Sequence, residues 1–409
     1  MKAFILAIIV IVYLYRLLLH LLRGRSVHRP VPANVADVYD QATYQKWQAY
    51  HSEKNRLAII TDTVTLALEL GLIVFGAYPA FARLFPAAPF WQMTSVFVLL
   101  SAASTLVMLP FSWHDTMGIK QKYGFNRTDR KTFWLDQLKE FLISLIVMIA
   151  IGALLMWLHH LLGDLIILAF AVVMTLLLLV ITFLYPFLSR IFNHFTPLED
   201  GDLKQKLTAM LEKHGYKVRA IQVMDASKRS SKSNAYFTGF GKMKTIVLYD
   251  TLVASMTPDE ICAVFAHEMG HGLHKDTLKN QILSFVQMLL LGTLAYFFLR
   301  MPNACQDFGF DSLNYGFVIA VLIMNVFSLI APLYGLLTSN VSRRAEYRAD
   351  AQAVSEGYAD ELVTALKKLS RENFADLSPD PLLVALEYSH PTLSQRIDAI
   401  DRQKQGDRA

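Results

Sequence analysis

The sequence has very few cysteines. Only Cys262 and Cys305 occur in 409 residues, and they lie far apart. This excludes a disulfide framework and a metal site built from cysteine pairs. The sequence also lacks internal repeats, low-complexity segments and nucleic-acid-binding motifs. The net charge of +5 comes from basic residues dispersed through loops, so we predict no nucleic-acid partner.

Apolar residues are abundant instead, at 54% of the chain, against roughly 45–50% in soluble domains. They form long runs that reach or approach the ~20 residues needed to cross a bilayer as a helix. Helices are the expected spanning form, because the runs lack the alternation of barrel strands. We predict seven transmembrane helices, at about residues 3–22, 59–84, 93–113, 140–162, 165–188, 281–300 and 317–338.

The loops between these runs differ in charge. Residues 23–58 and 114–139 carry six Lys or Arg each, whereas none occur in 85–92, 159–164 and 301–316. The positive-inside rule therefore predicts an N-terminus outside and a cytoplasmic C-terminus. The first run is expected to be retained as a helix rather than cleaved as a signal peptide, because no small-residue cleavage site follows it before RGRSVHRP.

The segment between the fifth and sixth runs has the pattern of a globular domain. LEDGDLKQKLTAMLEKHGY predicts an amphipathic helix that ends at Gly215, and VRAIQVMD, NAYFTGF and KTIVLYD predict a sheet of about three strands. Thr257, Pro258 and Glu260 predict the start of a helix with a capping box. After the seventh run, SRRAEYRADAQAVSEGYADELVTALKKL and LSQRIDAI predict further helices.

These patterns divide the chain into four segments. The first is residues 1–188, with five spans, and the second is the cytoplasmic α+β segment 189–280. The third is residues 281–338, with spans six and seven, and the fourth is the C-terminal helical segment 339–409.

The stretch FAHEMGHGLH contains the pattern H-E-x-x-H at His267, Glu268 and His271. Helical residues four apart share a face, so both imidazoles can reach one metal ion with Glu268 beside them. Zn²⁺ suits such ligands and, in catalytic sites, takes three protein ligands plus water. It lowers the pKa of that water toward ~7, and a nearby carboxylate accepts the proton. A surface helix with coincidental histidines is the alternative.

A third ligand must come from elsewhere in the chain. His274 lies about 10.5 Å along the helix axis from His267, and the metzincin spacing fails because position 277 is Thr. Glu346 in SRRAEYRAD is the better candidate, with Asp350 one turn later on the same face. One of these carboxylates could bind zinc while the other accepts a hydrogen bond from a ligand imidazole. Taken alone, the pair is a weak signal.

At this point several segments together resemble a known family. SKRSSKSNAYFTGFGKMKTIVLYDTL, HEMGH and the EYRAD segment are similar to the Ste24 type of CAAX prenyl proteases, in zinc peptidase family M48. KYGFNRTDRKTF and FNHFTPLEDGDLK match the family in order as well, and the resemblance runs from about residue 30 to about 400. The shorter HtpX type has fewer spans and fits less well.

The resemblance implies seven helices in a barrel around a large chamber, with a gluzincin site on the cytoplasmic side. It assigns one Zn²⁺ per chain to His267, His271 and Glu346, with Glu268 as general base and Asp350 as partner of a ligand histidine. It also places Asn234, with Ala235 and Tyr236, on a strand that pairs with substrate. His390 in YSHPTLSQR corresponds to a histidine that steadies the oxyanion. Without the resemblance, the local sequence predicts that Asn234 is a turn residue and that His390 is a loop residue.

Some polar residues lie within or beside the predicted spans. Glu69 is ionisable at membrane depth, so we expect it to face a cavity rather than lipid. A transporter site would give the same pattern. His159 and His160 close a span and are expected at the membrane interface.

The sequence therefore predicts an integral membrane zinc metalloendopeptidase. Its expected partners are membrane lipid and a peptide or protein substrate, and the resemblance implies C-terminally prenylated substrates. A membrane quality-control protease without a prenyl requirement is one alternative. A non-catalytic metal-binding membrane protein or transporter is another, although a structural metal site needs no Glu268. Compact loops favour a bacterial inner membrane over the endoplasmic reticulum. Nothing in the sequence indicates an oligomeric state.

Overall fold

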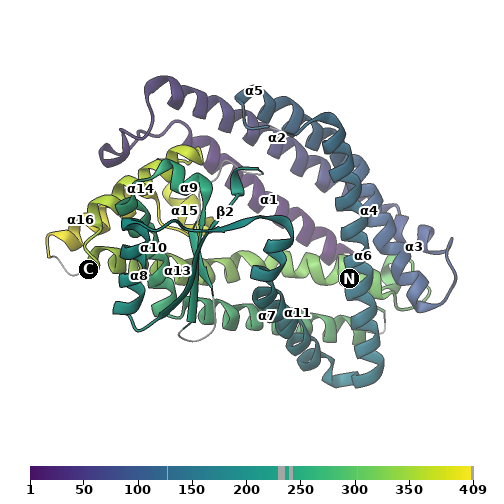
Figure 1. Cartoon of the computed structure of the whole chain (residues 1–409). Coiled ribbons are helices and arrows are strands. Elements are labelled where there is room, and N and C mark those ends of the chain that lie inside the picture. Colours follow the sequence, from purple (N-terminus) through teal and green to yellow (C-terminus); the bar gives the residue numbers. More distant parts are fainter. Residues whose placement is uncertain (127, 229–234, 239–242, 302, 407–409) are drawn as a thin grey trace. The chain divides into compact units, whose positions relative to one another are not determined.

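A computed structural model describes residues 1–126, 128–228, 235–238, 243–301 and 303–406 (Figure 1). Two compact units interleave along the sequence. The first comprises Met1–His28, Gln45–Leu176 and Ser284–Tyr334, and the second comprises Arg29–Tyr44, Leu177–Leu283 and Gly335–Ala409.

The first unit is formed by helices, most of them long and apolar, and the others only one or two turns in length. They are α1 Lys2–Ser26, α2 Gln41–Val74, α3 Ala77–Ala82, α4 Pro89–Trp113, α5 Gln121–Tyr123, α6 Arg130–Leu162, the start of α7 Ile166–Phe192, most of α11 Asp276–Arg300, α12 Tyr315–Phe317 and the start of α13 Met324–Ser355. Two π-helical turns, His114–Lys120 and Val318–Ile323, extend α4 and precede α13. Short 3₁₀ turns lie at Gly163–Leu165 and Gln306–Phe308.

Membrane helices are confirmed by their length and composition. Over the described residues, six helices are long and apolar enough to cross a bilayer. The predicted run 165–188 lies on α7, where the apolar segment Leu168–Val180 is shorter. The second predicted span was too long, because α2 ends at Val74 and Gly76 takes a left-handed φ of 64°. α6 leaves Leu142, Ile146 and other apolar side chains exposed, as a lipid-facing helix would.

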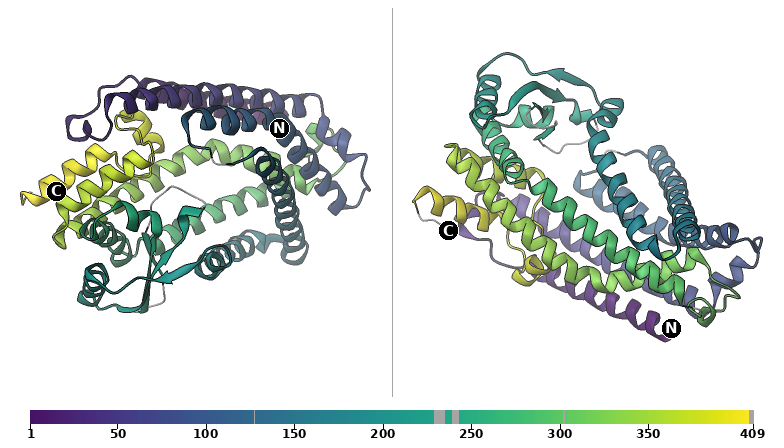
Figure 2. Two further views of the ribbon diagram at one scale, coloured as in Figure 1. Left: turned by 45° about the horizontal axis from the view of Figure 1, so that its top comes forward. Right: turned by 90° about the horizontal axis from the view of Figure 1, so that it is seen from below.

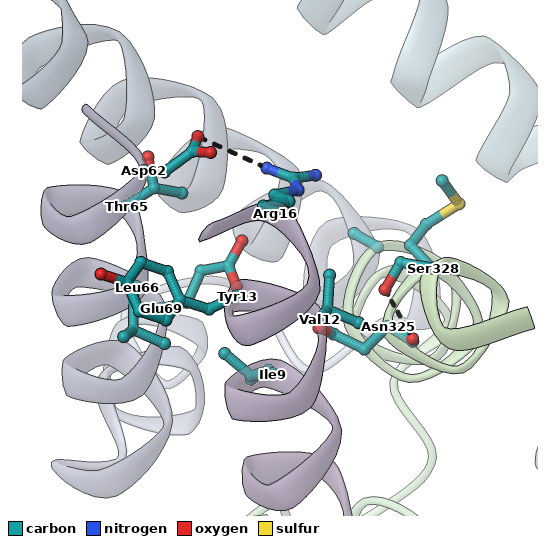
Figure 3. A pocket seen from close by; sticks show the side chains of 12 residues that line it. Ile9, Val12, Tyr13, Arg16, Asp62, Thr65, Leu66, Glu69, Asn325 and Ser328 are labelled. Carbon is teal, nitrogen blue, oxygen red and sulfur yellow. Dashed lines mark hydrogen bonds and ion pairs between the residues drawn. The ribbon is translucent and has the colours of Figure 1, made fainter. Parts of the chain in front are cut away.

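A cavity of about 230 Å³ with both polar and apolar lining lies in this first unit, between α1, α2 and the start of α13 (Figure 3). The two helices α1 and α2 run side by side (Figure 2), and Tyr13 on α1 bonds Thr63 on α2 at 2.9 Å. Glu69 lines the cavity together with Arg16 and Asp62, and these last two approach to 3.7 Å. The expectation that Glu69 faces a cavity is therefore confirmed.

The second unit contains a four-stranded sheet in the order β1-β2-β4-β3. Its strands are β1 Phe195–Pro197, β2 Lys217–Met224, β3 Ala235–Thr238 and β4 Met243–Tyr249. β2 and β4 are parallel, whereas β1 and β3 are antiparallel to their neighbours. The sequence predicted the last three strands and missed β1, which has three residues and ends in a proline, as an edge strand can.

The second unit also contains short helical elements. They are the 3₁₀ turns Ala33–Val35 and Ala226–Lys228, and the helices α8 Asp202–Lys213, α9 Asp250–Ser255, α10 Pro258–Leu273, α14 Ala359–Glu372, α15 Pro381–Glu387 and α16 Leu393–Lys404, with the C-terminal part of α13. α10 contacts α8, α14 and β3. Its predicted capping box is confirmed, with Thr257 and Glu260 each bonding the other's backbone N–H.

The two helices α10 and α13 approach closely at Gly270. A Cβ atom on Gly270 would lie 2.8 Å from the Cα atom of Ala349 and 3.0 Å from the Cβ atom of Gln352. These distances are shorter than van der Waals contact between carbon atoms. Only glycine therefore permits this approach.

We predict that Gly270→Ala lowers the thermal unfolding midpoint of the detergent-purified protein. The added methyl group would push α10 away from α13, and such overpacking typically costs about 1–3 kcal/mol. Gly335→Ala is the matched control, because Gly335 is also helical and an added Cβ would meet nothing within 4 Å. That variant should unfold at the parent's midpoint or slightly above it, since alanine favours helix over glycine by about 1 kcal/mol. Equal midpoints for both variants would contradict the close-packing argument.

Candidate metal centre

Three potential metal ligands converge between α10 and α13. One ligand atom each from His267, His271 and Glu346 lies within 4.8 Å of the other two. The Nε2 atom of His267 is 3.6 Å from one oxygen of Glu346, and the Nε2 atom of His271 is 3.5 Å from the other. Two imidazole nitrogens and a carboxylate are a donor set that suits a catalytic divalent metal. The residues therefore fit a metal ion.

His267 is oriented by Asp350. Its Nδ1 atom lies 2.9 Å from Asp350 Oδ1, and the side chain of Asp350 is 1% exposed. An ionised carboxylate can only accept hydrogen bonds, so the Nδ1 atom must donate. The Nε2 atom of His267 is then left without a proton in the neutral ring and faces Glu346. This is the hydrogen bond that the sequence analysis expected of one of the two carboxylates on α13.

Arg396 on α16 holds Asp350 in place. Its Nε and Nη2 atoms donate to the two oxygens of Asp350 at 2.8 and 2.6 Å, a bidentate pair. The Nη1 atom of Arg396 also lies 3.4 Å from Glu346. Burial disfavours the charged guanidinium, but the nearby Asp350 and Glu346 outweigh it and raise the pKa of Arg396. The sequence analysis did not single out Arg396, although it lies in YSHPTLSQR.

His271 is oriented by a different carboxylate. Its Nδ1 atom lies 3.1 Å from Oδ2 of Asp276, the first residue of α11. Burial would lower the pKa of His271, but hydrogen bonds to Glu346 and Asp276 outweigh it and raise the pKa to about 9. Sequence analysis missed Asp276. It lies five residues after His271, beyond helical spacing, and reaches it only because Lys275 takes a left-handed φ of 55°.

Glu268 lies between the two histidines on α10 and is partly buried. Burial raises the pKa of Glu268, although His267 and His271 oppose the shift. A raised pKa is typical of carboxylates that accept and return protons near neutral pH.

His390 also reaches this group of side chains. Its Nε2 atom lies 3.3 Å from Glu346, and its Nδ1 atom is 2.9 Å from the hydroxyl of Ser389. The side chain is 64% exposed, so it lies at the open side of the centre. His274, the weaker candidate of the sequence analysis, is exposed at the C-terminus of α10 and is not part of the group.

The predicted substrate strand is described only in part. Asn234 lies outside the described residues. Ala235 and Tyr236 begin β3, where they pair with Leu248 and Val247 of β4. β3 is last in the strand order and contacts α10, which bears the histidines. The role of these three residues in holding substrate stays a prediction.

Known protein families match nearly the whole chain. The CAAX prenyl protease N-terminal domain, with five membrane helices, matches residues 3–194, and peptidase family M48 matches residues 197–404. The chain is 33% identical to CAAX prenyl protease 1 homolog of Arabidopsis thaliana, covering 96% of this chain and 95% of that protein. It is 33% identical to CAAX prenyl protease 1 of Saccharomyces cerevisiae, covering 91% and 88%.

A solved structure also matches this chain. The crystal structure of S. mikatae Ste24p superposes with a TM-score of 0.86 and 31% identity, covering 98% of this chain and 99% of that one. The resemblance inferred from the sequence motifs is confirmed, and so is the mainly helical membrane fold with a small sheet. The family implies a metal ion, which the His267, His271 and Glu346 group fits. The chain therefore belongs to peptidase family M48 and is a membrane-embedded metalloprotease that carries the CAAX prenyl protease N-terminal helices.

Proposed function

We propose that this metalloprotease uses one Zn²⁺, held by His267, His271 and Glu346, to cleave prenylated proteins near their C-terminus on the cytoplasmic side of the membrane. The observation that carries the proposal is the convergence of two Nε2 atoms on one buried carboxylate, with Glu268 beside them. A zinc ion bound there would lower the pKa of a water molecule and polarise the scissile carbonyl.

The chain's own residues move the proton. Glu268 accepts a proton from the attacking water and delivers it to the nitrogen of the departing amine. Its partly buried position and raised pKa suit both steps. Asp350 and Asp276 accept hydrogen bonds from the Nδ1 atoms of the two histidines, so each ring turns Nε2 toward Glu346, where a bound zinc ion would replace any proton on Nε2.

His390 is suited to stabilise negative charge on the carbonyl oxygen. It lies at the exposed side of the centre with its Nε2 atom 3.3 Å from Glu346. Donation from this nitrogen to a developing oxyanion would lower the barrier only in the transition state. The substrate backbone would run alongside β3, where Asn234, Ala235 and Tyr236 are proposed to hold it by strand addition. The packing of β3 against α10 supports this.

The names of the relatives support the proposed substrate class. Proteins named CAAX prenyl protease share about a third of their residues with this chain over nearly its full length. A quality-control protease that cleaves membrane polypeptides without a prenyl group stays the alternative. The charge of the loops supports a cytoplasmic active site. The preference for a bacterial inner membrane stays a prediction from loop length.

We expect Glu268→Gln to abolish proteolysis while zinc is retained. The glutamine keeps the size of the side chain but cannot accept the proton, so peptide cleavage should fall by at least about 10²-fold. Metal analysis and a cleavage assay on the same preparation measure both properties. Glu346→Ala is the contrasting variant, because it removes a ligand and should lose zinc as well. Zinc loss in Glu268→Gln that equals the loss in Glu346→Ala would contradict the role of Glu268 as base.

Cleavage of a prenylated peptide should exceed that of the same peptide without its prenyl group. Burial of lipid carbon contributes about 0.8 kcal/mol per CH₂, so the lipid should favour binding strongly. Initial rates on the two peptides at equal concentration measure the preference, and Glu268→Gln provides the background. Equal rates would favour the quality-control alternative while leaving the zinc chemistry intact.

A cysteine placed in KRSSK, residues 228–232, should react with a membrane-impermeant maleimide only from the cytoplasmic side. The positive-inside rule gives the reason, because the loops predicted on the same side of the membrane as KRSSK are those that carry the basic residues. Ala87→Cys is the control, since Ala87 is exposed in the segment 85–92, which carries no Lys or Arg, and should react only from the opposite side. The natural Cys262 and Cys305 are buried and should contribute little background. Reaction at KRSSK from the outer side would reverse the proposed topology.

A further inference from the structure

The fold brings Asp276 into contact with His271, although the spacing of the two residues in the sequence does not predict this contact. α10 ends at Leu273 and α11 begins at Asp276, so the chain turns between them within two residues. Lys275 takes a left-handed φ of 55° in this turn, a conformation that costs a non-glycine residue roughly 1–2 kcal/mol. The turn brings the buried carboxylate of Asp276 back onto the ring of His271.

Two cations fix the orientation of this carboxylate. Oδ1 of Asp276 accepts hydrogen bonds from Nη2 of Arg348 on α13 at 2.9 Å and from Nζ of Lys279 at 3.0 Å. Oδ2 is then the oxygen that faces Nδ1 of His271, at 3.1 Å. Because one oxygen is held by two donors, the other cannot easily turn away from the imidazole.

The same arrangement occurs on the other histidine. Asp350 bonds His267 through Nδ1 and is itself held by Arg396, just as Asp276 bonds His271 and is held by Arg348. Asp350 and Asp276 come from different helices, so neither pair is a consequence of the other's helical spacing. Both rings therefore direct Nε2 toward Glu346.

We propose that Asp276 is a positioning residue for the metal centre, which fixes the tautomer and ring orientation of His271, and that Arg348 acts through it. This inference rests on the proposed metal site. Asp276 also begins α11, one of the helices long and apolar enough to cross the membrane. The start of that helix is thereby tied to a metal ligand.

The test measures metal binding rather than proteolysis. Zn²⁺ affinity of the full-length protein in detergent is determined by competition with a chelator, and the visible spectrum is recorded after loading with Co²⁺. Asp276→Ala should bind Zn²⁺ about 10–100-fold more weakly, as removal of such a partner typically does, with an altered Co²⁺ spectrum. Asp276→Asn should lose less, because its amide oxygen can still accept from Nδ1. Arg348→Gln should lie between the parent and Asp276→Ala.

Glu356→Ala is the matched control for a merely structural effect. Glu356, the residue that follows α13, is another carboxylate with a buried side chain that contacts a histidine and a lysine, with His214 at 2.6 Å and Lys213 at 2.7 Å, but touches no proposed ligand. It should lower the unfolding midpoint without changing Zn²⁺ affinity or the Co²⁺ spectrum.

The possible outcomes distinguish the role proposed for Asp276 from the proposed metal site on which it rests. Parental Zn²⁺ affinity and Co²⁺ spectrum in Asp276→Ala would overturn the role of Asp276 alone. If that variant does not fold, parental values in both Asp276→Asn and Arg348→Gln would overturn it instead. Zinc retained at full affinity in His267→Ala would overturn the proposed metal site, and the role of Asp276 with it.

Discussion

The close approach of α10 and α13 at Gly270 is the constraint on which the candidate metal centre depends. His267 and His271 belong to one helix and Glu346 to the other, so the ligands converge only if the helices nearly touch. The absent side chain at Gly270 allows this, since a Cβ there would lie 2.8 Å from Ala349. Gly270 lies between the two histidines of H-E-x-x-H, and Ala349 lies between Glu346 and Asp350. The contact is thus made within a turn of every ligand.

Burying these charged groups would be costly if they were unpaired. A single buried carboxylate without a partner loses several kcal/mol of hydration. Here Asp350 is paired with Arg396, and Asp276 with Arg348 and Lys279. Both arginines bind carboxylates that in turn bind histidines, so the same ion pairs that neutralise buried charge also orient the proposed ligands. Stability and ligand geometry rest on the same contacts.

The sequence predicted the parts of this centre that follow helical periodicity. His267, Glu268 and His271 share a face because of their spacing, and the start of α10 was readable from Thr257 and Glu260. Glu346 and Asp350 were found only as a pair whose roles stayed open until the family resemblance. Asp276, Arg348 and Arg396 were missed because their contacts depend on a left-handed turn at Lys275 and on helices brought together from distant segments. No periodicity encodes such contacts. The short strand β1 and the early end of α2 were missed for a similar reason, since local turns rather than apolar patterns set those boundaries.

A hydrolytic centre in a membrane protein must keep water near its ligands, and the composition of the helices explains how. α10, which bears both histidines, is not among the helices apolar enough to span a bilayer. α13 begins with the apolar MNVFSLIAPLYGLL and ends with the polar SRRAEYRAD, so Glu346 lies on the hydrophilic part of a helix that is otherwise suited to lipid. α11 shows the reverse order, with Asp276 and Lys279 in its first turn and apolar residues after them. Both membrane helices therefore carry their contacts to the centre at their polar ends. This order of composition keeps the polar ends out of the hydrocarbon, because moving either of them into lipid would expose Asp276, Glu346 or Asp350 to a medium that cannot solvate them.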